Sequence, residues 1–280
     1  MSPARRVSPW LLLGLVTAFA CGSPEVASAP SRDQLFAVAW AQSSVEADAA
    51  IRATYRSATR MLDPLIAEPE QRAAIEQVGS VKELTKLAVI VDVDETVLDN
   101  LPYQAWAVAT GRDWSPDTWG KWVDDRVAPA IPGAAAFLRA AADRGITVFY
   151  VTNRSEAQEP STRANLVAHG FPMTPGQDTI LSRINTSEKG VRRSAIAGTH
   201  RILMLIGDNL GDFVDGYKSD AAHRRHLLDS SLEHLGHDWF VIPNPVYGSW
   251  PDAMWLPQEP ATTRQKHELM IAGLERWKGP

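Results

Sequence analysis

Three short apolar runs, each ending in a polar cluster, constrain the fold of this chain most strongly. They cover residues 87–91, 146–151 and 202–206 and are rich in β-branched side chains without polar alternation. Runs of this kind are typical of strands buried on both faces of a parallel sheet. Helical patterns lie between them, at residues 133–143, 157–169 and 188–197. The alternation predicts an α/β fold with a doubly wound, mostly parallel sheet flanked by helices.

Helical segments are expected outside this core. Apolar residues recur at three- and four-residue steps over residues 33–61, and Pro64 and Pro69 are expected to end that stretch. With 45% hydrophobic and 22% charged residues among 280, the chain suits one large domain with helical additions at its N-terminus, in an insert and at its C-terminus. The expected boundaries are 33–280 for the domain, about 33–80 for its helical N-terminal part and about 85–245 for its core.

The first residues have the pattern of an export signal. Arg5 and Arg6 precede an apolar run at residues 10–20, which is too short to span a bilayer comfortably. We therefore expect a signal peptide over residues 1–20, followed by a tether rich in Ser, Pro and Ala over residues 21–32.

Cys21, the only cysteine in the chain, follows this apolar run directly. Ala18-Phe19-Ala20 fits the rule for ordinary signal peptidase, which would release a periplasmic or secreted protein. Ala20-Cys21-Gly22 instead resembles a bacterial lipobox, although positions 18 and 19 are irregular for one. A solitary cysteine at this point favours lipid attachment to Cys21 and a membrane-anchored protein of the cell envelope. In both cases the chain cannot form an internal disulfide.

The first polar cluster places two carboxylates at the end of a predicted strand. Asp92 and Asp94 are expected to point the same way, because side chains along a strand alternate with period two. Carboxylates so close need a cation or a shared proton to relieve their repulsion. A calcium loop of the EF-hand type is excluded, since Val97 stands where that loop needs Gly and no Glu closes it.

The third apolar run leads into further carboxylates at the same sheet edge, where ligands bind in folds of this kind. Asp208 ends the run, and Asp212 follows four residues later, on the same face if a helix starts there. One interpretation is that Asp208 or Asn209 simply caps that helix. Beside Asp92 and Asp94, however, these oxygens complete a site for Mg²⁺, which prefers a few carboxylates, a backbone carbonyl and waters.

Groups suited to an anion are expected at the same edge. Thr152 and Asn153 follow the second run, and Lys189 opens a helix, where its charge opposes the helix dipole unless an anion balances it. Taken alone, Thr152 and Asn153 fit a turn better, and Lys189 fits a surface lysine better. Together with Mg²⁺, these groups would offset the repulsion between a phosphate and a carboxylate nucleophile. In-line attack by Asp92 would give an acyl phosphate, and Asp94 would protonate the leaving alkoxide and then deprotonate the attacking water.

Four segments together resemble the phosphatases of the haloacid dehalogenase (HAD) superfamily. They read VIVDVDET (89–96), YVTNR (150–154), SEKG around Lys189, and IGDNLGDF (206–213). More narrowly, the chain resembles the class C acid phosphatases, bacterial lipoproteins that dephosphorylate nucleotides and other small monoesters. The narrower resemblance also rests on AVAWAQSS (37–44), GFP (170–172) and PNPVYGSW (243–250), whereas Val93 departs from the Leu that is frequent there.

The resemblance implies a role for each matching position. Asp92 would be the nucleophile and Asp94 the general acid and base. The groups that would hold Mg²⁺ are the Asp92 carboxylate, the Asp94 backbone carbonyl and the Asp208 carboxylate, with Asp212 in support through water. The residues that would hold phosphate are Thr152, Asn153 and Lys189.

Tryptophans gather in the insert between the first two apolar runs. They are Trp106, Trp114, Trp119 and Trp122. Core packing is the default for such residues, and Trp119 and Trp122, three positions apart, fit one buried helix face. An insert above a phosphate site would equally provide a stacking wall for a base or ring. The resemblance assigns that substrate-binding role to Trp119 and to Tyr247 in a late loop.

The predicted function is therefore an exported, Mg²⁺-dependent acid phosphatase that hydrolyses small phosphomonoesters, nucleoside monophosphates among them. A net charge of −5 and a pI near 5.8 argue against nucleic-acid polymers as partners, and the oligomeric state is left open. One alternative is a phosphotransferase with an acceptor other than water. The other is a non-catalytic surface-binding lipoprotein, which the presence of Asp94 and Lys189 opposes. His223 and His226 resemble a ligand pair, but the arginines between them favour a solvated helix face.

Overall fold

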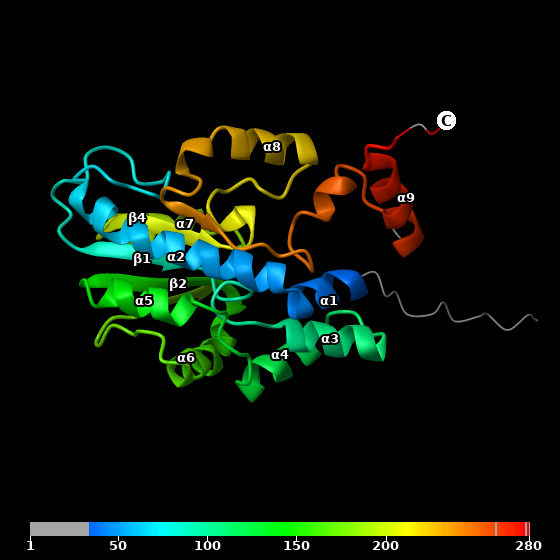
Figure 1. The fold of residues 1–280 in the computed structure, drawn as a ribbon, viewed down its shortest axis with the longest axis horizontal. Helices are drawn as coiled ribbons and strands as arrows, with labels where there is room; N and C mark the ends of the chain where they lie inside the picture. The colour runs from blue at the N-terminus through cyan, green and yellow to red at the C-terminus, as the bar shows by residue number, and fades with distance from the viewer. Residues whose placement is uncertain (1–33, 261, 278, 280) are drawn as a thin grey trace, which may run out of the picture.

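A five-stranded, fully parallel β-sheet forms the centre of the computed structural model, which describes residues 34–260, 262–277 and 279 (Figure 1). The predicted signal peptide, the tether and Cys21 lie outside the described residues. The strand order is β3-β2-β1-β4-β5, which confirms the predicted doubly wound α/β fold. The strands are β1 (Leu87–Val91), β2 (Ile146–Ser155), β3 (Ile180–Arg183), β4 (Arg201–Gly207) and β5 (Trp239–Val241).

The central strand β1 is enclosed on every side. It pairs in parallel with β2 along one edge and with β4 along the other. Val89 and Val91 belong to one hydrophobic core, while Ala88 and Ile90 belong to the core on the opposite face. Burial on both faces explains the uninterrupted apolar run in the sequence, and it places the carboxyl end of β1 in the middle of the sheet edge.

Helices cover both faces of the sheet (Figure 1). Leu62 of α2 (Val45–Ala67) and Phe137 of α5 (Ala134–Ala142) pack in one core, and Ile196 of α7 (Gly190–Ala197) packs in the other. The remaining α-helices are α1 (Leu35–Ser43), α3 (Leu101–Thr110), α4 (Pro116–Asp125), α6 (Glu159–Ala168), α8 (Ala221–Asp229) and α9 (Thr263–Gly273). Short 3₁₀ helices are η1 (Glu156–Gln158), η2 (Leu210–Asp212), η3 (Leu232–His234) and η4 (Asp252–Met254).

Ser44 divides the predicted N-terminal helix into α1 and α2. Its side chain accepts a hydrogen bond of 3.1 Å from the Ala47 backbone N–H, the capping arrangement that starts a helix. The expectation that Pro64 ends this helix is wrong, because Pro64 lies inside α2. Proline removes one helical N–H donor, but the fully buried Leu62 and Leu65 on either side hold this turn against the sheet.

Strand boundaries differ from the sequence prediction at the site edge. β2 continues past Thr152 and Asn153 to Ser155, so these residues belong to the strand rather than to a turn beyond it. β3 and β5 were not predicted, because strands of four and three residues are too short to stand out as apolar runs. Among the described residues, no helix combines the length and apolar character needed to cross a bilayer.

Candidate active site

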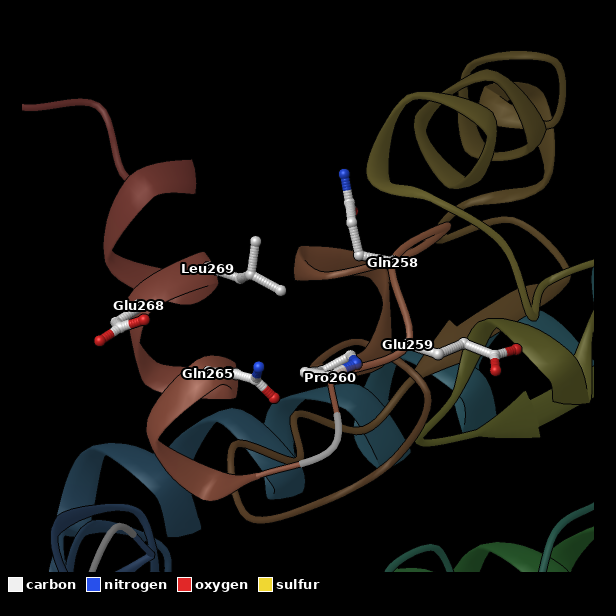
Figure 2. A pocket seen from close by; sticks show the side chains of 6 residues that line it. All are labelled: Gln258, Glu259, Pro260, Gln265, Glu268 and Leu269. Atoms are coloured by element: carbon white, nitrogen blue, oxygen red, sulfur yellow. The ribbon is translucent and has the colours of Figure 1, made fainter.

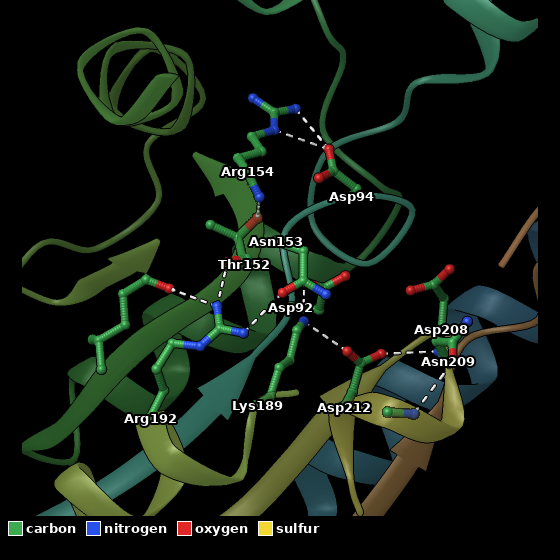
Figure 3. Close-up of polar contacts among 12 residues, drawn as sticks. Asp92, Asp94, Thr152, Asn153, Arg154, Lys189, Arg192, Asp208, Asn209 and Asp212 are labelled. Carbon is green, nitrogen blue, oxygen red and sulfur yellow. Dashed lines mark hydrogen bonds and ion pairs between the residues drawn. The ribbon is translucent and has the colours of Figure 1, made fainter. Parts of the chain in front are cut away.

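Three aspartates converge at the carboxyl edge of the sheet, where β1 and β4 end as neighbours. One carboxylate oxygen from each of Asp92, Asp208 and Asp212 lies within 4.8 Å of the others (Figure 3). Asp92 follows β1, and its backbone N–H donates to the carbonyl of Ile206 in β4 at 3.0 Å. Asp212 lies in the η2 turn, where its Oδ2 accepts from the Asn209 backbone N–H at 2.9 Å. The structure thus brings these three predicted residues together.

Lys189 places a positive charge inside this acidic cluster. Its Nζ lies 2.5 Å from Asp92 Oδ1 and 2.6 Å from Asp212 Oδ1, and the residue is 3% exposed. Burial opposes the charge, but the two carboxylates more than offset it, so the pKa of Lys189 is raised. The next residue, Gly190, donates its backbone N–H to Asp215 Oδ1 at 2.8 Å. A β-carbon at Gly190 would lie 2.3 Å from Asp215 Oδ2, so a larger residue would displace the Asp215 carboxylate from this contact.

Negative charge exceeds positive charge in the cluster. Burial raises the pKa of Asp92 to about 7 against the pull of Lys189, and repulsion from Asp212 and Asp94 adds to the rise. Burial and repulsion from Asp212 and Asp92 also raise the pKa of Asp208 well above its usual range. A divalent cation would relieve this repulsion, and carboxylate oxygens are the donors that hard cations prefer. The residues therefore fit a divalent metal site.

Asp94 has different partners from Asp92. Its Oδ1 accepts from Asn100 Nδ2 at 2.9 Å and from Arg154 Nε and Nη2 at 3.0 and 2.8 Å. Figure 3 shows the Asp94 side chain directed at Arg154. Because β1 ends at Val91, the period-two alternation that predicted a paired orientation stops before these residues. Asp92 and Asp94 were expected to point the same way, but the structure holds the two carboxylates with different partners.

Thr152 and Asn153 lie at the end of β2, at the same edge as Lys189 (Figure 3). Thr152 Oγ1 accepts from the Arg154 backbone N–H at 3.1 Å. Arg192 Nη1 and Nη2 donate to the Thr152 carbonyl and to Asn153 Oδ1 at 2.5 and 2.8 Å. Sequence reasoning singled out neither arginine. The available signal for Arg192 was its position three residues after Lys189, one helical turn away.

The helix α4 places two tryptophans against the partners of Asp94. The Arg154 guanidinium carbon lies 5.6 Å from the centre of the Trp119 ring, within the range of a cation–π contact. Trp122 Nε1 donates to Asn100 Oδ1 at 2.7 Å. Both rings therefore contact residues that hold Asp94, whereas the exposed members of the insert are Trp106 and Trp114.

Tyr247 lies in the loop after β5. It packs against a small hydrophobic cluster formed by Val246, Val38 of α1 and Leu101 of α3. In this loop, Asn244 Oδ1 accepts from the Val246 backbone N–H at 2.9 Å. Tyr247 therefore belongs to the loop after β5, whereas Trp119 belongs to the insert between β1 and β2.

Two further features lie apart from the acidic cluster. His223 and His226 are exposed on α8 with ring centres 6.3 Å apart, and among the described residues they belong to no metal-ligand cluster. A hollow of about 430 Å³ lies beside α9 (Figure 2). Its lining consists of Gln258, Glu259, Pro260, Gln265, Glu268 and Leu269, which include no member of the acidic cluster.

In this parallel sheet the central strand leads into Asp92, which pairs with Lys189 and clusters with two aspartates that follow the neighbouring strand. This arrangement is that of the HAD phosphohydrolases. The chain belongs to one family of that class. The family model described as HAD superfamily, subfamily IIIB (Acid phosphatase) matches residues 16–250.

Known structures agree with this assignment. The class C acid phosphatase from Bacillus anthracis is similar in two structures, with TM-scores of 0.76 and 0.77 and identities of 30% and 29%. Each comparison covers 88% of this chain and 98% of that one, and the second structure has tungstate bound. The predicted resemblance to class C acid phosphatases is confirmed.

Curated plant proteins are similar over shorter regions. Acid phosphatase 1 from Solanum lycopersicum is 29% identical over 163 residues, and the stem 28 kDa glycoprotein of Glycine max is 21% identical over 164 residues. These matches cover 57% and 58% of the plant proteins, so the chain spans little more than half the length of these curated relatives.

Proposed function

We propose that this chain is an exported, Mg²⁺-dependent acid phosphatase that hydrolyses small phosphomonoesters through a phospho-aspartate intermediate. The observation that carries the proposal is the placement of Asp92, which follows the central strand within 2.5 Å of Lys189 Nζ and clusters with Asp208 and Asp212. Family membership and the similarity to the Bacillus anthracis acid phosphatase support it. Tungstate, bound in one structure of that relative, is a tetrahedral oxyanion like phosphate.

The residues that would hold Mg²⁺ are the carboxylates of Asp92 and Asp208 and the backbone carbonyl of Asp94, with Asp212 in support through water. When bound there, Mg²⁺ would offset the negative charge of the phosphate and of the nucleophile. The oxygen-only donor set and the mutual repulsion of the aspartates support this choice of metal.

Asp92 would attack phosphorus in line with the leaving oxygen and form an acyl phosphate. Lys189 holds Asp92 Oδ1 and would also neutralise the transferred phosphoryl group. Thr152 Oγ1 accepts from the Arg154 backbone N–H, which leaves the hydroxyl proton for a phosphate oxygen. The side-chain amide of Asn153 would donate to a second phosphate oxygen.

Asp94 would act as general acid and then as general base. It would protonate the leaving alkoxide as the phosphorus–oxygen bond breaks. It would then take a proton from the water that hydrolyses the phospho-aspartate. Asp94 receives hydrogen bonds from Asn100 and Arg154 rather than from Lys189. These partners differ from those of Asp92, which supports different roles for the two aspartates.

Nucleoside monophosphates would be among the substrates. Trp119 beside Arg154, and Tyr247 in the loop after β5, would stack on a base or another ring. One lysine and one Mg²⁺ suit a terminal monoester better than a triphosphate, which carries additional charge.

Export rests on the sequence of residues 1–32. We propose removal of a signal peptide at Ala20 and lipid attachment to Cys21, with ordinary signal-peptidase cleavage as the alternative. Several acyl chains are needed for stable attachment, because one chain holds a protein only marginally. Mass analysis of the mature N-terminus distinguishes the two, since only the anchored form carries a diacylglyceryl group on Cys21.

Phosphate release from p-nitrophenyl phosphate and a nucleoside monophosphate, with and without Mg²⁺, tests the proposed function. Asp92→Asn should lower kcat by at least about a thousandfold, the scale of losing a catalytic nucleophile. Asp94→Asn should accumulate a phosphorylated enzyme that mass analysis detects. Asp143→Asn, at an exposed position after α5, is the matched control and should turn over normally. Near-normal turnover by Asp92→Asn would contradict the covalent mechanism.

A further inference from the structure

The two oxygens of the Asp94 carboxyl group have unequal surroundings. All three hydrogen bonds that this carboxyl group receives, from Asn100 Nδ2 and from Arg154 Nε and Nη2, end on Oδ1. In the part of the chain that the structure describes, no protein donor reaches Oδ2. A carboxylate oxygen with three donors has no lone pair left for a proton, so any proton on Asp94 resides on Oδ2.

Arg154 is itself held rigidly. Its side chain is 2% exposed. Nη1 donates to Thr162 Oγ1 at 3.1 Å, which fixes the end of the guanidinium opposite Asp94. The Trp119 ring lies 5.6 Å from the guanidinium carbon. An arginine constrained in this way presents its donors in one orientation. The paired N–H donors of its planar guanidinium group therefore orient the carboxylate that they bind.

Asn100 supplies the third donor and is fully buried. Its Nδ2 donates to Asp94 Oδ1 at 2.9 Å and to Glu95 Oε2 at 3.2 Å. Its Oδ1 accepts from Trp122 Nε1 at 2.7 Å and from Arg154 Nη2 at 3.4 Å. Both ends of the side-chain amide are therefore occupied, so Asn100 cannot rotate without losing bonds at both ends.

We propose that Arg154 and Asn100 are positioning residues that hold Asp94 with Oδ2 as its proton-carrying oxygen. The inference rests on the proposed role of Asp94 as general acid and base. In the first step, the Oδ2 proton passes to the ester oxygen as its bond to phosphorus breaks and the bond from Asp92 to phosphorus forms. In the second step, Oδ2 takes a proton from water as the water oxygen bonds to phosphorus and Asp92 leaves. Asp94 Oδ2 therefore carries the proton in both steps.

The dependence of the reaction rate on the leaving group tests whether Asp94 donates a proton to it. Alkoxides are strong bases and need a proton to leave, whereas p-nitrophenolate leaves readily without one. The readout is the ratio of kcat/KM for a primary alkyl phosphate to kcat/KM for p-nitrophenyl phosphate. This ratio does not depend on the fraction of folded enzyme, so a partly unstable variant still gives an answer.

Arg154→Met should lower the alkyl-to-aryl ratio about tenfold or more, approaching the loss expected for Asp94→Asn, since general acid catalysis contributes about 10²–10⁴-fold. Arg154→Lys restores one charged donor and should recover part of the ratio. Asn100→Ala should lower the ratio in the same direction. Arg163→Met is the control, because Arg163 pairs with Glu159 and Asp178 away from Asp94 and should leave the ratio unchanged.

The outcomes separate this inference from the proposed function. If Asp94→Asn leaves the ratio unchanged, the general-acid role fails. If Asp94→Asn lowers the ratio but Arg154→Met does not, the positioning role of Arg154 is wrong while the function stands. In an Asp94→Asn background, Arg154→Met should change the ratio no further, because Arg154 acts through Asp94. A further loss there would also overturn the inference.

Discussion

Asn244 Nδ2 donates a hydrogen bond of 2.7 Å to Asp208 Oδ2. Asp208 follows β4, whereas Asn244 lies in the loop after β5, so the bond joins two neighbouring strand ends. The same amide accepts from the Val246 backbone N–H through Oδ1 and so orders the loop that carries Tyr247. One side chain therefore connects a candidate metal ligand to a candidate substrate-binding residue.

Asn244→Ala should weaken metal binding more than it weakens the fold. Groups that orient a metal ligand typically contribute about ten- to a hundredfold in metal affinity or activity. We therefore expect the Mg²⁺ concentration for half-maximal activity to rise by about tenfold or more. A Mg²⁺ titration of phosphate release measures this change. Asn185→Ala, at an exposed position, is the control, and an unchanged titration midpoint in Asn244→Ala would show that Asp208 needs no such support.

Metal removal should abolish activity, and Mg²⁺ should restore it. A readout independent of activity is thermal stability, because a cation that binds only the folded state stabilises it by about 2.7 kcal/mol at a hundred times its Kd. The Tm of the metal-free protein should therefore rise with added Mg²⁺, and Asp208→Asn should weaken that response. Full activity in strong chelator, or a Tm unaffected by Mg²⁺, would contradict the metal assignment.

The centre of the fold was predictable from sequence, and its edges were not. β1, β2 and β4 are buried on both faces, so each appears as a continuous apolar run. β5 is three residues long and ends at Val241, which is 45% exposed. β3 contains Ser182 and Arg183 among its four residues. Neither edge strand carries a periodicity that distinguishes it from a loop.

The residues of the candidate site were likewise only partly predictable from sequence. Asp92, Asp208 and Lys189 stand at ends of strands or helices, so the rule that ligands bind at the carboxyl edge of a parallel sheet brings them together. Arg154 lies 60 residues from Asp94 in sequence, and their contact arises only from tertiary packing. No spacing rule relates these two residues, which explains why sequence reasoning assigned Asp94 a role but found nothing that holds it.

Glu76→Ala should destabilise the protein by about 1.5–3 kcal/mol, because it removes the charged hydrogen bonds between Glu76 and the buried Arg193 and leaves Arg193 with its second partner, Asp215. Arg193 is fully buried and donates to both Glu76 oxygens through Nε at 3.0 and 3.1 Å. Its Nη1 also donates to the Asp212 carbonyl at 3.0 Å, so the pair supports the η2 turn of the candidate metal site. Urea denaturation measures the loss, with the exposed Glu83→Ala as control. Equal stability of both variants would contradict the prediction.

His234 should make stability depend on pH. Its Nδ1 lies 2.8 Å from Asp238 Oδ1, and this hydrogen bond raises the pKa of His234 against partial burial. Because the folded pKa is above the unfolded value of about 6.5, the stabilisation is fully present below that value and is lost as pH rises through the folded pKa. The Tm advantage of wild type over His234→Gln should therefore shrink as the pH rises above about 6.5. The exposed His226→Gln is the control, and a pH-independent advantage would contradict this account.

Stacking on Trp119 and Tyr247 should give a preference for substrates that carry a base. Base–aromatic stacking contributes about 1–3 kcal/mol, and about 1.4 kcal/mol corresponds to a tenfold difference. A nucleoside 5′-monophosphate should therefore exceed ribose 5-phosphate about tenfold or more in kcat/KM. Both substrates release a primary alkoxide, so any effect that Trp119 exerts through Arg154 and Asp94 cancels in their ratio.

Trp119→Ala and Tyr247→Ala should each lower this ratio while changing kcat/KM for ribose 5-phosphate much less. Trp114→Ala is the matched control, because Trp114 lies in the same insert but is 57% exposed. A lower ratio in only one variant would assign the stacking surface to that residue alone. If wild type shows a ratio near one, or both variants leave it unchanged, these aromatic rings stabilise the insert and the late loop instead. In that case Trp119 acts only through its contact with Arg154, and Tyr247 only through its packing beside Val246.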